Sequence, residues 1–403
     1  YRQTDLDTWL PVLTGMQAGW LVLQAPPDRA IPENFLLGLL EAGIEPVLHF
    51  KLPPDQLPPE ADLAFLYHLY AKWGLRYITL FDKPNLRSTW QSTNWAQTDL
   101  VERFLDIYLP QAENCLNAGL TPVFPPLEPG GDYWDTAFLQ AAIQGIQRRG
   151  YKELLAKLVI GAVARAGERS LNWGAGGPER WPSTRPYFTP ANEEDHRGFR
   201  IFDWYNTHVQ SILIVERPLF LFEVGAAPTE DPNFKKHTQI NLDIARLIEA
   251  EDLPGLEPIP HNVAGAAFLL FPGPRPAPTV SQAWYTPQGE PLPILAAFRD
   301  RDQESGPGAC AETHSTPIEH YLLLPSFDGH ISDLHLEIIR PFIKKYQPTM
   351  GFSLREALQA RRVTVIGGIG AYPQEQINQL REAGCIVHQI EDHGIDIASF
   401  FVG

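Results

Sequence analysis

The first two-thirds of this 403-residue chain repeats one pattern, and that pattern restricts the fold more than any other feature. A short, continuous apolar segment ends in polar, Pro or Gly residues and is followed by a helical stretch with one apolar face. Apolar strands that alternate with amphipathic helices are typical of parallel βαβ units, because helices cover both faces of such a sheet. We therefore predict an α/β protein built on parallel strands.

Seven strands follow from this pattern, at residues 20–24, 45–50, 77–81, 121–125, 158–164, 219–224 and 266–271. Helices are predicted at residues 5–13, 32–42, 61–73, 100–118, 137–149, 201–215 and 236–250. Seven strands are one short of a (β/α)8 TIM barrel, and the simplest repair is a first strand at or before Tyr1 that is cut or only partly present. An open doubly wound sheet is the alternative, but the long loops after residues 164 and 224 favour a barrel mouth.

A change of composition marks the end of the predicted barrel. Residues 273–293 are rich in Pro and Gly, and residues 299–315 are polar and rich in Gly. We predict a TIM barrel over residues 1–300 and a small flavodoxin-like or Rossmann-like α/β domain over residues 316–403. The predicted strands of the second domain are residues 320–324, 363–366 and 386–390, and its helices are residues 334–346, 354–360 and 374–383.

Charge and cysteine content argue against several classes of function. The formal net charge of −16 repels nucleic acid and anionic membrane surfaces, and it suits neutral or cationic ligands. The sequence contains no run of about 18 apolar residues, so we predict no membrane span. Cys115, Cys310 and Cys385 lie far apart, and the sequence has no cluster with metal-ligand spacing. We therefore predict no metal and no cofactor.

Carboxylates and aromatic residues gather after the predicted strands, where the functional side chains of a barrel project. The candidates are Asp82, Lys83 and Asn85 after residues 77–81, Glu128, Asp132 and Trp134 after residues 121–125, Trp173, Trp181, Tyr187 and His196 after residues 158–164, and Glu223 near residue 224. Aromatic faces stack on the C–H surfaces of sugars, while carboxylates and amides bind the hydroxyl groups. This rim predicts a carbohydrate ligand.

Two segments resemble motifs of the retaining glycosidases of clan A. Residues 77–95, which contain Asp82-Lys83-Pro84-Asn85, resemble the Asn-Glu-Pro-Asn signature at strand 4 of these barrels, and Phe222-Glu223-Val224-Gly225 resembles their strand-7 signature. In that family the strand-4 Glu is the acid/base and the strand-7 Glu is the nucleophile. The resemblance, which covers residues 20–271, implies that Glu223 is the nucleophile.

The sequence departs from the family at the acid/base, where Lys83 stands in place of Glu. Retaining hydrolysis needs two carboxyl groups about 5–5.5 Å apart, and an ammonium near Glu223 would form an ion pair with it instead. Three explanations for this change are open. Asp82 can replace the missing acid, or Glu128 can do so at the wider spacing of an inverting enzyme. Alternatively, the barrel has lost hydrolysis.

Structural roles compete with the functional ones. Glu223 can be a strand-end carboxylate paired with Lys83 or an arginine, and Asp82 and Lys83 can form a structural ion pair. Asn85 can serve the turn that Pro84 sets up. Trp134, Trp173 and Trp181 can simply cover the barrel top, and His196 can be a loop hydrogen-bonder.

The predicted second domain carries a Gly-rich turn at residues 367–370, between a strand and a helix. Such a turn can hold phosphate at a helix N-terminus, but it lacks the third Gly of the dinucleotide fingerprint. The unit resembles the Rossmann-like repeats of bacterial cell-wall-binding modules, over about forty residues.

We predict a bacterial, carbohydrate-active barrel of the glycoside-hydrolase type, whose acid/base is altered. The rival is a non-catalytic glycan-binding or envelope-structural protein on the same scaffold, and a third reading is a nucleotide-linked enzyme that uses the Gly-rich turn. The chain begins at Tyr1 without a signal-like segment, which predicts a fragment or processed form. We expect it outside the cell or at its surface, with the cytoplasm as the alternative, and the sequence specifies no oligomeric state.

Overall fold

The computed structural model describes residues 1–188, 193–227, 234–249, 253–271, 282–286, 288–301, 318–324, 348–366, 372–383 and 385–390. The chain divides into two compact units, Tyr1–Glu304 and Ser305–Gly403. Each unit has its own parallel sheet.

The first unit is built on seven parallel strands that follow one another in sequence order, β1-β2-β3-β4-β5-β6-β7. Their bounds are β1 (Trp20–Gln24), β2 (Glu45–Phe50), β3 (Tyr77–Leu80), β4 (Thr121–Phe124), β5 (Val159–Arg165), β6 (Leu219–Gly225) and β7 (Val263–Phe268). Each strand pairs with the next, as Val22 of β1 does with Val47 of β2. This stepwise order winds the strands in one direction.

Side chains rather than a backbone ladder close the barrel between β1 and β7, the two ends of the sheet. Cα atoms of β1 and β7 approach within 8 Å of each other. Trp20 of β1 packs against Gly265 of β7, where a Cβ atom would lie only 2.9 Å from the indole ring. The predicted fold class, a parallel α/β barrel followed by a small α/β unit, is confirmed, and seven barrel strands lie among the described residues.

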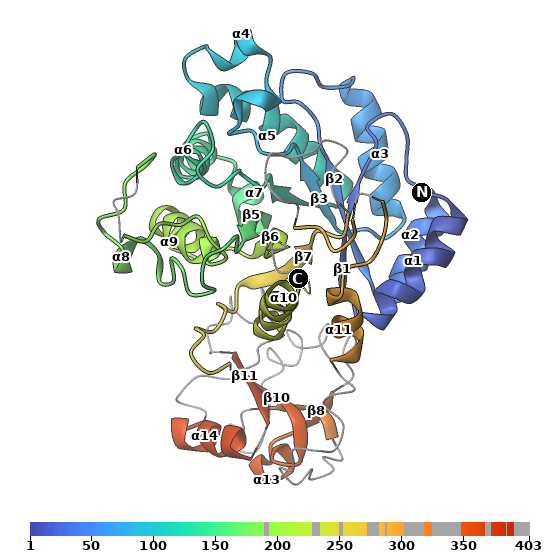
Figure 1. Ribbon diagram of the computed structural model, residues 1–403, viewed down its shortest axis with the longest axis vertical. Helices are drawn as coiled ribbons and strands as arrows, with labels where there is room; N and C mark the ends of the chain where they lie inside the picture. The colour runs from blue at the N-terminus through green and yellow to red at the C-terminus, as the bar shows by residue number, and fades with distance from the viewer. Residues whose placement is uncertain are drawn as a thin grey trace. The chain divides into compact units, whose positions relative to one another are not determined.

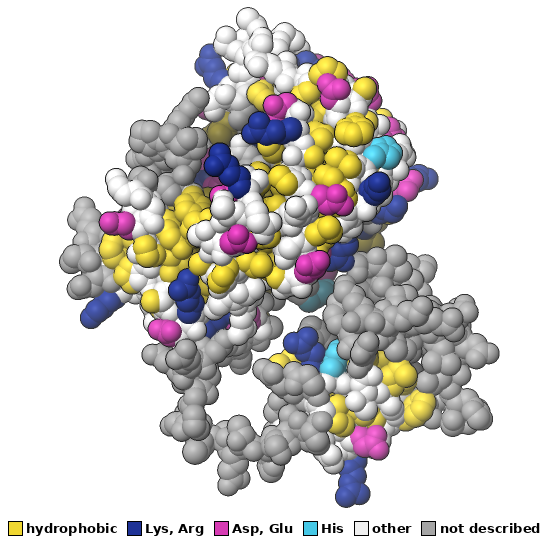
Figure 2. Space-filling model, turned by 90° about the vertical axis from the view of Figure 1, so that its right-hand side faces the viewer, with side chains coloured by type: hydrophobic (Ala, Val, Ile, Leu, Met, Phe, Trp, Pro, Cys, Tyr) yellow, Lys and Arg dark blue, Asp and Glu magenta, His cyan; other side chains and the backbone are white. Residues whose placement is uncertain are grey.

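Helices surround the strands on the outside of the barrel (Figure 1). The longer ones are α1 (Gln3–Gly15), α2 (Glu33–Glu41), α3 (Glu60–Lys72), α5 (Leu100–Ala118), α6 (Asp135–Arg148), α9 (Ile201–Leu213) and α10 (Lys235–Ile248). Shorter helical segments are η1 (Arg87–Thr89), α4 (Ser92–Trp95), α7 (Lys152–Lys157), α8 (Gly177–Arg180) and α11 (Ile294–Asp300). On the face that carries α1 and α2, hydrophobic side chains lie among charged ones (Figure 2).

Helix α5 shows how the sequence sets these elements. Phe104, Leu105, Tyr108 and Cys115 recur at helical spacing and are fully buried. The helix ends at Gly119, whose φ of +94° is the left-handed conformation that glycine adopts at low cost. The predicted helix over residues 100–118 therefore has the observed bounds.

Two apolar layers hold the barrel together. The inner layer fills the lumen with Val47, Val123, Val163, Phe220 and Phe222. The outer layer lies between the strands and the helices, and its centre is Phe104, whose ring meets those of Phe81, Phe124 and Phe138. Burial of both faces explains why the strands read as continuous apolar segments.

Strand β7 begins and ends three residues earlier than predicted, because small residues hide its hydrophobic signal. Its sequence, Val263-Ala264-Gly265-Ala266-Ala267-Phe268, has only two large side chains. The apolar residues Leu269 and Leu270 lie beyond the strand, and their carbonyl groups accept hydrogen bonds from the backbone N–H groups of residues 284 and 285.

The second unit has a four-stranded parallel sheet in the order β11-β10-β8-β9. Its described elements are β8 (Ile318–Leu323), β9 (Thr349–Gly351), α13 (Leu354–Ala357), β10 (Ala360–Ile366), α14 (Gln374–Glu382) and β11 (Ile386–Ile390). Strand β9 was not predicted, and α13 is shorter than predicted because β10 already begins at Ala360. The predicted helix at residues 334–346, Cys310 and the whole of the Gly-rich turn at residues 367–370 lie outside the described residues.

We predict that Gly161→Ala lowers the unfolding free energy by about 1–3 kcal/mol, a typical cost of overpacking. A Cβ atom on Gly161 of β5 would lie 2.5 Å from the carbonyl oxygen of Phe124, which belongs to the backbone of β4 and cannot rotate away. Gly19→Ala is the control, because no atom lies within 4 Å of its Cβ position. Urea denaturation of both variants measures the difference, and equal stabilities would contradict the tight packing of β4 on β5.

Candidate functional site

Four charged side chains meet at the C-terminal ends of four consecutive strands. Lys83 follows β3, Glu128 follows β4, Arg165 is the last residue of β5, and Glu223 lies near the end of β6. Parallel strands present these ends at the same mouth of a barrel, which is where barrel enzymes place their functional groups. We call these four residues the charge quartet.

Each cation of the quartet contacts both carboxylates. Lys83 Nζ lies 2.8 Å from Glu223 Oε1 and 3.2 Å from Glu128 Oε2. Arg165 donates to both oxygens of Glu128, from Nη1 at 2.6 Å and from Nη2 at 3.1 Å. It also donates to Glu223 Oε2, from Nε at 2.9 Å and from Nη2. The ion pair expected between Lys83 and Glu223 is thus present, together with an arginine.

The two carboxylates are close to each other. Because Lys83 Nζ contacts one oxygen of each, these oxygens lie at most about 6 Å apart. That is nearer to the spacing of about 5–5.5 Å in retaining glycosidases than to the 6.5–9.5 Å of inverting ones. The wider, inverting separation considered for Glu128 does not match this geometry.

The electrostatics of the quartet keep its members charged. Burial alone would raise the pKa of Glu223, but the charges of Lys83 and Arg165 outweigh it and lower the pKa from 4.5 to about 2. Burial would likewise lower the pKa of Lys83, yet Glu223 and Glu128 raise it above its usual value. An ammonium with a raised pKa is a poor proton donor at neutral pH.

Irregular backbone at the strand ends sets the direction in which these side chains point. Lys83 and Glu223 both have φ near +50°, a left-handed conformation that is strained for residues other than glycine. Register shifts interrupt the pairing of β5 with β6 between Val163 and Arg165, and of β6 with β7 between Leu221 and Val224. Bulges of this kind redirect side chains beside functional sites.

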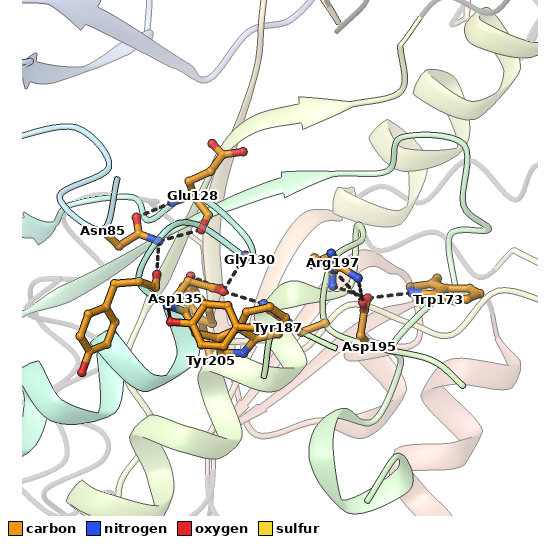
Figure 3. A network of polar contacts seen from close by, with 12 residues as sticks. Asn85, Glu128, Gly130, Asp135, Trp173, Tyr187, Asp195, Arg197 and Tyr205 are labelled. Carbon is orange, nitrogen blue, oxygen red and sulfur yellow. Dashed lines mark hydrogen bonds and ion pairs between the residues drawn. The ribbon is translucent and has the colours of Figure 1, made fainter. Parts of the chain in front are cut away.

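Asn85 holds the segment that carries Glu128. Its amide is fully buried and donates to the carbonyl oxygens of Glu128 at 2.8 Å and Tyr133 at 3.0 Å, while its Oδ1 accepts from the N–H of Glu128 at 2.8 Å. The carboxylate of Glu128 points away from Asn85 (Figure 3). The geometry gives Asn85 a positioning role, and ligand contact by Asn85 stays a prediction.

Asp82 lies beside the quartet with partners of its own. Its Oδ2 is 3.3 Å from Lys51 Nζ, and its Oδ1 is 3.9 Å from Nε2 of His49. That Oδ1 atom is buried and has no hydrogen-bond partner among the described residues. Burial lowers the pKa of His49 although Asp82 acts against this, so His49 stays neutral near pH 7.

A buried network supports the loop between β4 and α6. Asp135, which is 0% exposed, accepts from Gly130 N at 2.8 Å, from Tyr205 Oη at 2.9 Å and from Nε2 of His196 at 2.6 Å. His196 is only 1% exposed. The network fixes the loop that begins with Glu128 (Figure 3), and His196 acts here within the protein interior.

The predicted stacking tryptophans have neighbours on their rings. An arginine guanidinium lies over Trp173 at 4.5 Å from the ring centroid, over Trp134 at 5.8 Å and over Trp181 at 5.9 Å. Trp134 is 4% exposed and packs against Tyr187, which is 65% exposed. Asp132 is also exposed, and its carboxylate accepts from the N–H of Arg87. Tyr187 therefore offers the most open aromatic surface among these candidates.

Sequence reasoning missed Arg165, His49 and Lys51. Arg165 is the last residue of β5, one position beyond the predicted strand, so a strand end placed one residue later would have included it. His49 is near the end of β2 and Lys51 directly follows it, and the sequence prediction placed no candidate residue at this strand. The rule that strand ends carry function applies to all of them.

Among the described residues, no three His, Cys, Asp or Glu side chains are grouped as a metal site requires. None of the helices in the described part of the chain combines the length and the hydrophobicity of a membrane span.

No protein-family model matches this sequence, and no curated protein does. Solved structures similar to the chain include a GH128 (subgroup II) endo-β-1,3-glucanase from Sorangium cellulosum, with 16% identity over 75% of this chain and 94% of that one, at a TM-score of 0.41. Another is the β-D-glucuronidase of Dictyoglomus thermophilum, with 12% identity over 75% of this chain and 48% of that one, also at 0.41. The chain thus spans about half the length of that glucuronidase. The barrel is assigned from its own strand order, because similarities at this level say nothing about substrate or mechanism.

We predict that acid destabilises the wild type more than Glu223→Gln. The folded-state pKa of Glu223 is depressed, so the unfolded chain binds the proton more tightly, and stability is lost as pH falls from about 4.5 to about 2. The loss for this one group is up to about 3 kcal/mol. Urea denaturation across this pH range, with the exposed Glu153→Gln as control, measures it. Parallel pH profiles for wild type and Glu223→Gln would contradict the depressed pKa.

We also predict that Arg165→Met lowers the unfolding free energy at pH 7 by about 3–5 kcal/mol, because it leaves two half-buried carboxylates with Lys83 as their shared cation. Arg165→Lys keeps the charge but loses the two-pronged contact with Glu128, so its stability should lie between the other two. Chemical denaturation ranks the three proteins. A Met variant as stable as wild type would show that the quartet is not needed for stability.

Proposed function

We propose that the barrel mouth binds carbohydrate and does not hydrolyse glycosidic bonds. The observation that carries this proposal is the position of Lys83 and Arg165, each in contact with both Glu128 and Glu223. Hydrolysis by two carboxyl groups requires one of them to hold a proton for the leaving oxygen. In the quartet, both oxygens of Glu128 already accept hydrogen bonds from Arg165, and Oε2 of Glu128 also lies 3.2 Å from Lys83 Nζ.

The other candidate residues do not supply the missing proton donor. Lys83 has a raised pKa and remains an ammonium, and Asp82 makes its contacts with Lys51 and His49. Glu223 is ionised to a low pH, which suits a hydrogen-bond acceptor for sugar hydroxyl groups. The resemblance of residues 82–85 and 222–225 to glycosidase motifs then reflects a shared scaffold, with the acid/base position taken by Lys83.

The surface around the quartet has both kinds of group that bind sugars, polar side chains and an exposed aromatic ring. Charged donors and acceptors of the quartet can bind hydroxyl groups, and Tyr187 offers an exposed ring for a pyranose face. Trp173 and Trp181 are partly exposed at the same rim and remain predicted subsites. A location outside the cell or at its surface, without nucleic-acid partners, also remains a prediction.

A retaining glycoside hydrolase is the second candidate, and the spacing of the carboxylates favours it. Oxygens of Glu128 and Glu223 at most about 6 Å apart are compatible with a nucleophile and an acid on either side of a sugar. For this activity, a bound substrate would have to displace Arg165 and Lys83 from Glu128. An assay that measures both glycan binding and sugar release separates the two candidates.

A glycan array combined with a reducing-sugar assay tests the proposal on wild type, Glu223→Gln and the control Glu153→Gln. Glu153 is exposed on α7, which precedes β5, so it lies toward the start of that strand while Arg165 is at its end, and it pairs with Lys157. We expect wild type and the control to bind the same glycans, with binding about tenfold weaker in Glu223→Gln because a charged acceptor is lost. We expect no turnover by any of the three.

Turnover by wild type that Glu223→Gln abolishes would show a hydrolase and overturn the non-hydrolytic proposal. If wild type binds no glycan on the array, the carbohydrate role itself is wrong. Circular dichroism of each variant confirms that a loss of binding does not come from unfolding.

A further inference from the structure

A cavity of about 1060 Å³ runs along the barrel wall between β1 and β7. Its volume is at the upper limit for pockets that hold small molecules. Most of its lining is apolar, from α1, β1 and the segment that follows β7; examples are Leu6, Trp9, Leu13, Leu21, Leu23 and Leu270. All of its lining residues lie in the first unit.

One end of this cavity is charged. Glu223 of the quartet lines it, together with Asp82, Lys51 and His49 at the ends of neighbouring strands. The lining also includes Gln17, Ala18 and Gly19, which precede β1, and the ion-paired Glu249 and Arg301. The cavity thus extends along the whole length of β1, about 17 Å for five residues, and reaches the proposed sugar site.

An additional β-strand does not fit this space. A strand inserted between β1 and β7 would separate them by two strand spacings, about 9.6 Å. Cα atoms of the two strands approach within 8 Å, and the ring of Trp20 already contacts Gly265 across the seam. The space therefore belongs to side chains, and a slender, flexible ligand fits it better than a polypeptide.

Two buried polar atoms in the lining have no hydrogen-bond partner among the described residues. One is Oδ1 of Asp82 at the charged end, which can accept from a hydroxyl group. The other is Nε1 of Trp284, a side chain that is only 2% exposed and whose N–H can donate to an oxygen. Buried groups of this kind cost free energy unless a ligand or water satisfies them.

We propose that this cavity binds the aliphatic aglycone of a glycoside whose sugar lies at Glu223 and Asp82. The inference rests on the proposed function and names its ligand class as amphiphilic glycosides with one alkyl chain. The chain lies among the apolar side chains of α1, β1 and the segment after β7. Hydroxyl groups of the sugar reach the charged end, beside Glu223 and Asp82.

Calorimetric titration of the protein with methyl, hexyl and octyl β-D-glucoside, below the micelle concentration, tests the inference. Each methylene that enters an apolar cavity strengthens binding about fourfold, so we expect octyl glucoside to bind at least about a hundredfold more tightly than methyl glucoside. Leu21→Trp and Leu270→Trp fill the cavity from its two walls and should reduce this gain to less than about tenfold. Leu37→Trp on the exposed face of α2 is the control and should keep the full gain.

Equal affinity for the three glucosides would overturn the inference, and glycan binding on the array would then leave the proposed function intact. A chain-length gain that persists in both filled variants would also overturn it, because the alkyl chain would then bind elsewhere. A gain lost in the filled variants, from a protein that binds octanol as tightly as octyl glucoside, would overturn the sugar part of the inference, while the glycan array alone would still decide the proposed function. The inference predicts that affinity rises with chain length only when the ligand carries a sugar and the cavity is open.

Discussion

Two cations shared by two carboxylates set the character of the barrel mouth. Lys83 and Arg165 each contact both Glu128 and Glu223, and the four residues come from four consecutive strands. Removing a charge from water costs several kcal/mol, and two opposite partners for each charge offset that cost. The loops after β3 and β4 and the bulged ends of β5 and β6 must therefore deliver their side chains to one point, so a shift in one strand end disturbs the other three.

Much of the barrel could be predicted from the sequence because its signals are local. Continuous apolar strands and the spacing of buried residues on α5 identified the βαβ order, and the strand-end rule located Lys83, Glu128 and Glu223. Strand β7 was shifted because its small residues carry a weak signal. Arg165 was missed because the predicted end of β5 stopped one residue short, so a small error of boundary removed a central residue of the site.

Other features of the site depend on contacts between segments far apart in the sequence. Asn85 reads as a turn residue, yet its amide binds the backbone around Glu128, more than forty residues away. His196 reads as a loop residue, yet it is buried against Asp135. Trp134 reads as an open aromatic residue, yet the guanidinium of Arg197, more than sixty residues away, lies over its ring. Local pattern identifies residue types that can bind sugar, but only packing decides which of their faces remain open.

The closure of the barrel by Trp20 and Gly265 has a consequence for its mechanics. A ring of hydrogen-bonded strands has no end from which to open, whereas this sheet has two ends, β1 and β7. Side-chain contacts resist separation less cooperatively than a backbone ladder, so we expect the wall to open first at this seam. The barrel thus resembles a rolled ribbon, and we expect its one seam to move more easily than the rest of its wall.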